Sequence, residues 1–222
     1  MSGMDKKVNC SESTIKSYVL RQGRLTNKQK KAIANAYENT FSYYQEASSE
    51  RADRQVILEI GFGNGQSLIR QAQENPDIDF IGVEVYPPGV GYLLGECQAN
   101  EITNIFVYQG DIESFLAQPN LPKWSKVQIY FPDPWHKRRH HKRRLISEAF
   151  IQKIESALSF GGLLHILTDW DQYANHIESV MQNADKFTKT ALQSRFERAK
   201  TKYEMRALKL GHTIHELLYV RS

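Results

Sequence analysis

The residues best suited to chemistry lie between Val127 and Arg144, in the sequence V-Q-I-Y-F-P-D-P-W-H-K-R-R-H-H-K-R-R. The segment begins with the apolar, β-branched and aromatic residues of a buried strand. Prolines on both sides of Asp133 end this strand, because proline cannot donate to a sheet ladder and restricts the residue before it. Six of the eight residues from Lys137 to Arg144 are Lys or Arg, which predicts an anionic partner. A rigid carboxylate, an aromatic ring and a polycation therefore lie side by side.

A second pattern places acidic residues at or near the ends of five predicted strands. They are Glu59, Glu84, Asp111, Asp133 and Asp169. In open α/β sheets the ligand binds beyond the carboxyl ends of the strands, so these residues are candidates for one binding site.

The first predicted strand is followed by a glycine turn, Gly61, Gly63 and Gly65, in the pattern G-x-G-x-G. Gln66 occupies the position where a dinucleotide fingerprint has its last glycine, so the turn departs from the nicotinamide pattern. Glu84 follows the turn by about 20 residues, where a carboxylate can accept hydrogen bonds from both ribose hydroxyls. Glu59 just before the turn disfavours a pyrophosphate and favours an adenosine with a cationic tail. S-adenosylmethionine meets this description.

The elements that position these residues alternate between strand and helix from residue 54 onward. Hydrophobic periodicity predicts strands at 56–60, 80–85, 105–108, 126–131 and 162–167, with weaker strands near 187–192 and 214–220. Helices are expected at 66–74, from the prolines at 87 and 88 to about 100, at 145–158 and at 173–181. This alternation predicts an α/β protein with a mostly parallel, Rossmann-like sheet of seven strands and helices on both faces.

Residues 1–50 lack a strand pattern and are expected to form a basic arm, followed by one helix from Asn27 to about Glu46. This helix either closes an edge of the core or contacts RNA. The catalytic domain is expected to span residues 51–222.

Composition limits the remaining possibilities. The 222 residues carry a net charge of +4, with basic residues clustered at 6–31 and 137–144, which favours a polyanion such as RNA as partner. Cys10 and Cys97 lie far apart and form neither a disulfide framework nor a zinc motif. Without a signal peptide or a membrane-length apolar run, the protein is expected in the cytoplasm, with no membrane partner.

Four motifs resemble the bacterial tRNA (guanine-N7-)-methyltransferases. They are E-x-G-x-G-x-G at 59–65, F-P-D-P-W-H-K-R-R-H at 131–140, T-D-W at 168–170 and T-K-Y-E at 201–204. The arm sequence R-Q-G-R-L-T at 21–26 is similar as well, so the resemblance covers nearly the whole chain. The F-P-D-P-W-H-K segment is specific, whereas many methyltransferases share the glycine turn.

The resemblance implies a class I methyltransferase that transfers a methyl group from S-adenosylmethionine to N7 of a variable-loop guanosine in tRNA. It implies cofactor contacts at the glycine turn, at Glu59, Glu84 and Asp111, and a functional Asp133 beside them. The implied guanosine or RNA contacts are Lys137, Arg139, His140, His141, Lys142, Arg143, Arg144, Asp169, Thr201, Lys202, Tyr203 and Glu204.

The chemistry of guanine gives Asp133 a specific role as the candidate catalytic residue. Guanine N7 has an in-plane lone pair and no proton, so its attack on a sulfonium methyl needs alignment and desolvation rather than a general base. A carboxylate can accept hydrogen bonds from N1–H and the amino group of guanine, which selects guanine over adenine. Asp133 is therefore expected to position the base, while Trp135 stacks on a base and Lys137 meets a phosphate. The alternative is that Asp133 is an exposed turn residue only.

Other interpretations remain open from the sequence. His136, His140 and His141 cluster, but without cysteine partners and among many cations they are expected to face RNA or solvent, so no metal is assigned. The chain could instead be a methyltransferase for another base or an amino group, or an RNA-binding protein with a vestigial cofactor pocket. A monomer and a homodimer are both compatible with the sequence.

Overall fold

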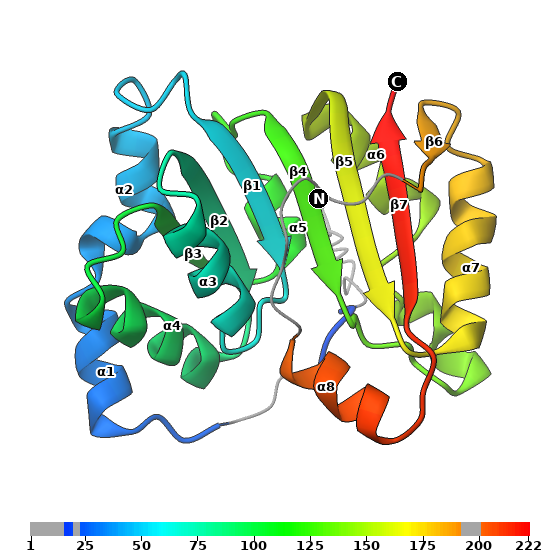
Figure 1. Ribbon diagram of the computed structural model, residues 1–222, viewed down its shortest axis with the longest axis horizontal. Coiled ribbons are helices and arrows are strands. Elements are labelled where there is room, and N and C mark those ends of the chain that lie inside the picture. Colours follow the sequence, from blue (N-terminus) through cyan, green and yellow to red (C-terminus); the bar gives the residue numbers. More distant parts are fainter. Residues whose placement is uncertain (1–15, 20–22, 192–200) are drawn as a thin grey trace, which may run out of the picture.

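The computed structural model describes residues 16–19, 23–191 and 201–222, with only the backbone of Lys202. In this part of the chain one seven-stranded sheet has the order β3-β2-β1-β4-β5-β7-β6 (Figure 1). Its strands are β1 (Gln55–Ile60), β2 (Ile78–Glu84), β3 (Ile105–Gln109), β4 (Trp124–Tyr130), β5 (Leu158–Thr168), β6 (Phe187–Lys189) and β7 (His215–Arg221). The first five run parallel, and β7 is antiparallel to β5 and β6. The predicted Rossmann-like fold is confirmed.

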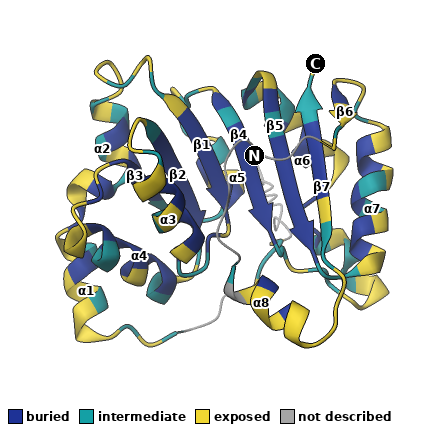
Figure 2. Ribbon diagram, viewed as in Figure 1, coloured by how far each residue is buried: buried dark blue, intermediate teal, exposed yellow. Residues whose placement is uncertain are grey.

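Both faces of the sheet are covered, which explains why the parallel strands are nearly continuous apolar runs. The helices are α3 (Gln66–Glu74), α4 (Pro87–Ala99), α5 (Ile112–Leu116), α6 (Glu148–Ala157) and α7 (Asp171–Gln182). One core joins Leu58 and Val127 of the strands to Phe115, Phe150 and Ile177 of α5, α6 and α7. The other core joins the strands to α3 and α4. Figure 2 shows the central strands buried along most of their length.

The order of the sheet determines where a ligand can bind. The chain proceeds outward from β1 to β2 and β3, then returns to the other side of β1 for β4 and β5. The connections after β1 and β4 therefore diverge, and a crevice opens at the carboxyl ends of these two strands. Helix α8 (Lys202–Lys209) lies below this edge in Figure 1.

The single helix predicted for residues 27–46 is wrong. The structure has α1 (Asn27–Ala34), a 3-10 helix η1 (Tyr37–Asn39) and α2 (Phe41–Glu46). The break has a tertiary cause, because the Asn39 amide donates to the carbonyls of Ile102 and Ile105 (2.9 and 3.0 Å) and Thr40 forms a β-bridge with Val107. Thr26 caps α1 and forms a capping box with Gln29.

The N-terminal helices pack against the rest of the fold. Gln29 of α1 donates to the Pro88 carbonyl at 3.0 Å, and Gln98 of α4 donates to the Ala32 carbonyl at 3.0 Å. Ala32 and Ala36 are buried in this contact. Helix α1 therefore closes one edge of the core.

Other element boundaries also differ from prediction. Helix α6 starts at Glu148 rather than 145, because Ser147 is its N-cap. The basic residues before it form a second 3-10 helix, η2 (Arg138–Arg143), and β5 begins at Leu158, four residues earlier than predicted. Helices α5 and α8 were not predicted. None of the helices in the described ranges combines the length and the apolar character of a membrane span.

Candidate active site

A cavity of about 460 Å³ opens at the carboxyl ends of β1, β2, β3 and β4. This size suits a ligand as large as a nucleoside. Its lining includes six predicted cofactor residues, Glu59, Gly61, Gly63, Glu84, Asp111 and Asp133. Thr201 and Tyr203 of the T-K-Y-E motif line the same cavity, although they lie more than a hundred positions after the glycine turn in the sequence. The sequence therefore predicted much of this lining.

The glycine turn after β1 adopts a conformation that favours glycine. Gly61, Gly63 and Gly65 have φ angles of 75°, 62° and 73°, in the left-handed region. A Cβ added to Gly61 or Gly63 would meet nothing within 4 Å, so both α-carbons face open space. Gly65 does not line the cavity: it caps α3, and its added Cβ would lie 2.8 Å from Leu93. Two glycines thus leave room for a ligand and the third permits close packing.

Glu84 holds the glycine turn through hydrogen bonds. One carboxylate oxygen accepts from the Gly63 amide (2.8 Å), and the other accepts from the amides of Val85 and Tyr86 (2.7 and 2.9 Å). The residue is 8% exposed. Burial raises the pKa of Glu84 despite the three amides that favour its charged form, with a smaller contribution from Asp133. The carboxylate is therefore fixed in place, and Oε2, which accepts from only one amide, has room to accept from a ligand.

Asp111 follows β3 and caps α5, accepting from the Ser114 amide at 3.0 Å and from the Ser114 hydroxyl at 2.7 Å. Partial burial alone would raise the pKa of Asp111, but the hydrogen bonds from Ser114 outweigh it and lower the pKa. Asp111 is therefore a fixed anion at the edge of the cavity.

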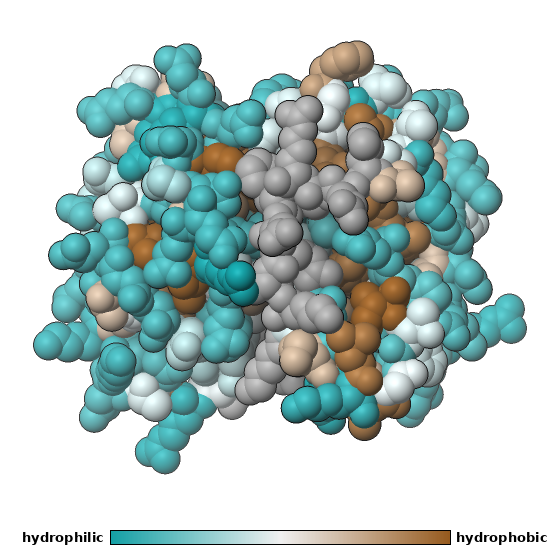
Figure 3. All heavy atoms as spheres, viewed as in Figure 1, coloured by the Kyte–Doolittle hydropathy of each residue, from teal (hydrophilic) through white to brown (hydrophobic). Residues whose placement is uncertain are grey.

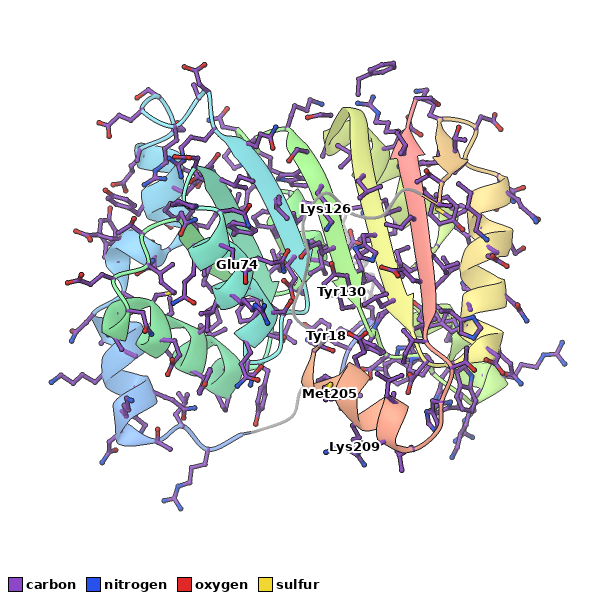
Figure 4. All side chains as sticks on the ribbon, viewed as in Figure 1. Tyr18, Glu74, Lys126, Tyr130, Met205 and Lys209 are labelled. Atoms are coloured by element: carbon purple, nitrogen blue, oxygen red, sulfur yellow. The ribbon has the colours of Figure 1, made fainter. Side chains whose placement is uncertain are left out.

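Tyr130 was not singled out in the sequence, although it precedes the proline segment. It lines the cavity, and its hydroxyl contacts His165 Nδ1 at 3.0 Å. His165 is buried, and its Nε2 contacts Glu216 Oε1 at 2.7 Å. A chain of polar groups therefore runs from the cavity across β5 to β7. Figure 4 shows Tyr130 and Lys126 on β4, with Tyr18 beyond the end of this strand.

The Asp133 loop is bounded by two strained aromatic residues. Phe131 and Trp135 have φ angles of 53° and 50°, a conformation that costs free energy for bulky side chains. The Phe131 amide donates to the Leu167 carbonyl at 2.8 Å, which ties the loop to the end of β5. Asp133 is exposed and lines the cavity. The prolines and this hydrogen bond restrict the backbone that presents Asp133 to the cavity.

The basic segment divides into two groups. Lys137, Arg139 and Lys142 are exposed. Arg144 is only 8% exposed: its Nε donates to the Pro134 carbonyl at 3.0 Å, and its guanidinium lies 5.1 Å from the Tyr173 ring. Burial lowers the pKa of Arg144. Arg143 also donates within the protein, to residues 16 and 18. These two arginines therefore have intramolecular partners that the sequence did not indicate.

The two predicted histidines adjoin these cations. His140 forms an edge-on contact with Trp135, at 5.8 Å between ring centroids. Desolvation and then the charges of Arg139 and Arg143 lower the pKa of His140. His141 Nε2 lies 3.2 Å from Arg144 Nη2. No group of three or more metal-ligating side chains is found among the residues that the structure describes.

The remaining predicted contacts lie around α8. Thr201 and Glu204 form its capping box, and Glu204 is 6% exposed, so both have a structural role. Asp169 Oδ2 lies 3.1 Å from His212 Nδ1 and does not line the cavity. Tyr203 is 61% exposed, and Met205, Leu208 and Leu210 are also exposed on this helix and its end. Figure 3 shows apolar side chains gathered over α8.

The lining of the cavity fits S-adenosylmethionine. Fixed carboxylates at Glu84 and Asp111 can accept hydrogen bonds from hydroxyl and amino groups, and together with Glu59 they favour a cationic ligand. The open space beside Gly61 and Gly63 allows a ligand to approach the backbone closely. The donor set therefore agrees with the expected cofactor.

Comparisons with known proteins agree with this geometry. A family model described as "Putative methyltransferase" matches residues 53–217. The tRNA (guanine-N(7)-)-methyltransferase of Pseudoalteromonas atlantica is 38% identical, over 100% of this chain and 99% of the relative. Proteins of the same name from Shewanella oneidensis and Marinobacter nauticus are 40% and 41% identical, over 93% and 94% of this chain and 92% of each relative.

Solved structures share the fold at low sequence identity. The 16S rRNA methyltransferase KamB superposes with a TM-score of 0.60 at 12% identity, covering 80% of this chain and 93% of that one. An rRNA methylase from Streptococcus thermophilus superposes with a TM-score of 0.52 at 14% identity, covering 81% and 95%.

Proposed function

This chain belongs to the tRNA (guanine-N(7)-)-methyltransferase family, and we propose that the cavity at the ends of β1 to β4 is its active site. The enzyme transfers a methyl group from S-adenosylmethionine to N7 of a guanosine in tRNA. The assignment of the site rests on one observation. Four acidic residues line the same cavity: Glu59, Glu84, Asp111 and Asp133.

The proposed cofactor contacts use groups that are already fixed. Glu84 would accept the ribose hydroxyls, because its carboxylate is immobilised by three amides. Asp111 would accept from the adenine amino group, and Glu59 would favour the cationic end of the cofactor. The glycine turn would let the cofactor lie against the backbone of β1.

Asp133 would orient guanine rather than remove a proton. S-adenosylmethionine supplies an electrophilic methyl group on a sulfonium. N7 carries a lone pair and no proton, so the protein must align N7 and exclude water. The Asp133 carboxylate would accept from N1–H and the amino group of guanine, an arrangement that adenine cannot satisfy. Tyr203, exposed and lining the same cavity, would lie beside the base.

The exposed cations beside this loop would bind the tRNA backbone. Lys137, Arg139 and Lys142 extend from a segment that begins four residues after Asp133. Phosphate contacts supply most of the affinity for a nucleic acid, whereas contacts to the base select the target. We propose the guanosine of the variable loop as this target, as the resemblance of the motifs implies.

Nucleoside analysis tests the proposal. Purified protein is incubated with S-adenosylmethionine and unmodified tRNA, and the digested product is analysed by mass spectrometry. The expected product is 7-methylguanosine, lost when adenosine replaces the variable-loop guanosine. The Asp133→Asn variant should give little product while still binding S-adenosylhomocysteine in calorimetry. A methylated amino group, or an active Asn variant, would contradict the assigned chemistry.

A further inference from the structure

The side chains of Trp135 and Arg143 bind three consecutive carbonyl groups of the N-terminal segment. Trp135 Nε1 donates to the Ser17 carbonyl at 3.0 Å. Arg143 donates from Nε to the Lys16 carbonyl and from Nη2 to the Tyr18 carbonyl, both at 2.9 Å. Recognition of main-chain carbonyls fixes the path of a segment without depending on its side chains.

The two donors are held in place relative to each other. The Arg143 guanidinium lies 3.8 Å from the centroid of the Trp135 ring, a stacked cation–π contact. Trp135 has a strained left-handed φ of 50°, and in this conformation its indole reaches the Ser17 carbonyl. A strained residue that persists beside an active site indicates a function for its orientation. Here the orientation completes a rigid pair of donors.

The bound segment forms part of the cavity wall. Ser17, Tyr18 and Val19 line the cavity together with Glu84 and Asp133. Further along the arm, Gly23 lies against Tyr86 and Pro88, so closely that an added Cβ would be 2.6 Å from each. The described residues of the arm therefore contact the loop after β4 and the start of α4, on opposite sides of β1. Figure 4 shows Tyr18 between the end of β4 and α8.

We propose that Trp135 and Arg143 are positioning residues that seat residues 16–19 as a wall of the cofactor and substrate cavity. The inference rests on the proposed function of that cavity. It replaces the expected roles of Trp135 as a base-stacking residue and of Arg143 as a phosphate contact. The carbonyl dipoles of the segment also stabilise a guanidinium that lies among several other cations.

Proteolysis without tRNA tests the seating. Trypsin cleavage after Lys16, followed by mass spectrometry, reports the population of the unseated segment when opening is fast. Arg143→Ala removes two hydrogen bonds and should raise the cleavage rate roughly tenfold. Trp135→Phe removes one donor without changing the charge and should raise it less. Arg138→Ala, on the same 3-10 helix and exposed, is the charge-matched control and should leave the rate unchanged.

The effect of bound cofactor on cleavage tests whether residues 16–19 contribute to the cavity wall or are only attached to the protein surface. Saturating S-adenosylhomocysteine should slow cleavage after Lys16 in the wild type, and both variants should bind it more weakly in calorimetry. Unchanged cleavage in both variants, or faster cleavage with unchanged cofactor affinity, would overturn the proposal. So would an Arg143→Ala variant that changes only the salt dependence of tRNA binding. A wild type that does not bind the cofactor would instead refute the proposed function.

Discussion

Replacing Glu84 by alanine should weaken cofactor binding and also destabilise the cofactor-free protein. The carboxylate accepts three backbone hydrogen bonds, from Gly63, Val85 and Tyr86. Alanine leaves all three amides without this acceptor. Gly63, Val85 and Tyr86 all line the cavity, so water can replace the lost oxygen at some of these amides but not at those that the fold shields from solvent.

The magnitude follows from the number of amides that lose their acceptor. A buried donor without a partner costs about 1–3 kcal/mol, so one or two such amides should cost on the order of 3 kcal/mol of unfolding free energy. For a protein of this size, that corresponds to a fall in Tm of roughly 6–12 °C. Loss of two charge-assisted hydrogen bonds to ribose should weaken cofactor binding by about 2–4 kcal/mol, or roughly 30- to 1,000-fold in Kd.

Two assays measure these effects separately. Calorimetry with S-adenosylhomocysteine, below the Tm of the variant, gives the Kd, and thermal unfolding without ligand gives the Tm. Glu50→Ala is the matched control, because it removes an exposed carboxylate far from the cavity. An unchanged Kd with a lowered Tm would mean that Glu84 stabilises the glycine turn but does not contact the cofactor. An unchanged Tm would refute the reasoning about the amides.

Three further predictions follow from the same site. The stability difference between wild type and Glu84→Ala should be larger near pH 4 than near pH 7. Burial raises the pKa of Glu84 in the folded protein, so this group stabilises the fold at pH values below the pKa that it has in the unfolded chain. The contribution is lost as the pH rises through the pKa that Glu84 has in the folded protein. Chemical unfolding of both proteins at several pH values measures the difference in their free energies of unfolding. Asp133→Asn should lower the rate constant of methyl transfer at least tenfold in single-turnover assays, while the affinity for tRNA is retained. The double variant Arg139→Ala with Lys142→Ala should reduce the slope of log affinity against log salt by roughly 1.4–1.8, whereas Arg144→Ala should lower the Tm with little change in slope.

The sequence predicted the sheet and most of the cavity because both depend on local patterns. Apolar runs bounded by glycine and proline gave strands close to those observed, and acidic residues near strand ends converge wherever a parallel sheet forms. Glu59, Glu84, Asp111 and Asp133 therefore line the same cavity.

Contacts between distant segments were not predictable in the same way. Asn39 and Thr40 break the expected N-terminal helix because they pair with residues near β3, more than 60 positions away. Likewise, the charge of Arg143 and Arg144 suggested RNA, but their hydrogen bonds depend on where residues 16–18 and the Pro134 carbonyl lie. Helix α8 did carry a local signal, since Thr201 and Glu204 have the spacing of a capping box.

The position of β7 in the sheet has a consequence for synthesis of the chain. Strand β7 pairs with β5 on one side and β6 on the other, yet it follows both in sequence. The first five strands can assemble once residue 168 has been made, but at 5–20 residues per second the first residue of β7 follows roughly 2–9 s later. During this interval β5 presents an open, apolar edge with unpaired backbone groups. Leu164 and Ile166, which later pair with β7, thus mark where a nascent chain is most exposed to aggregation.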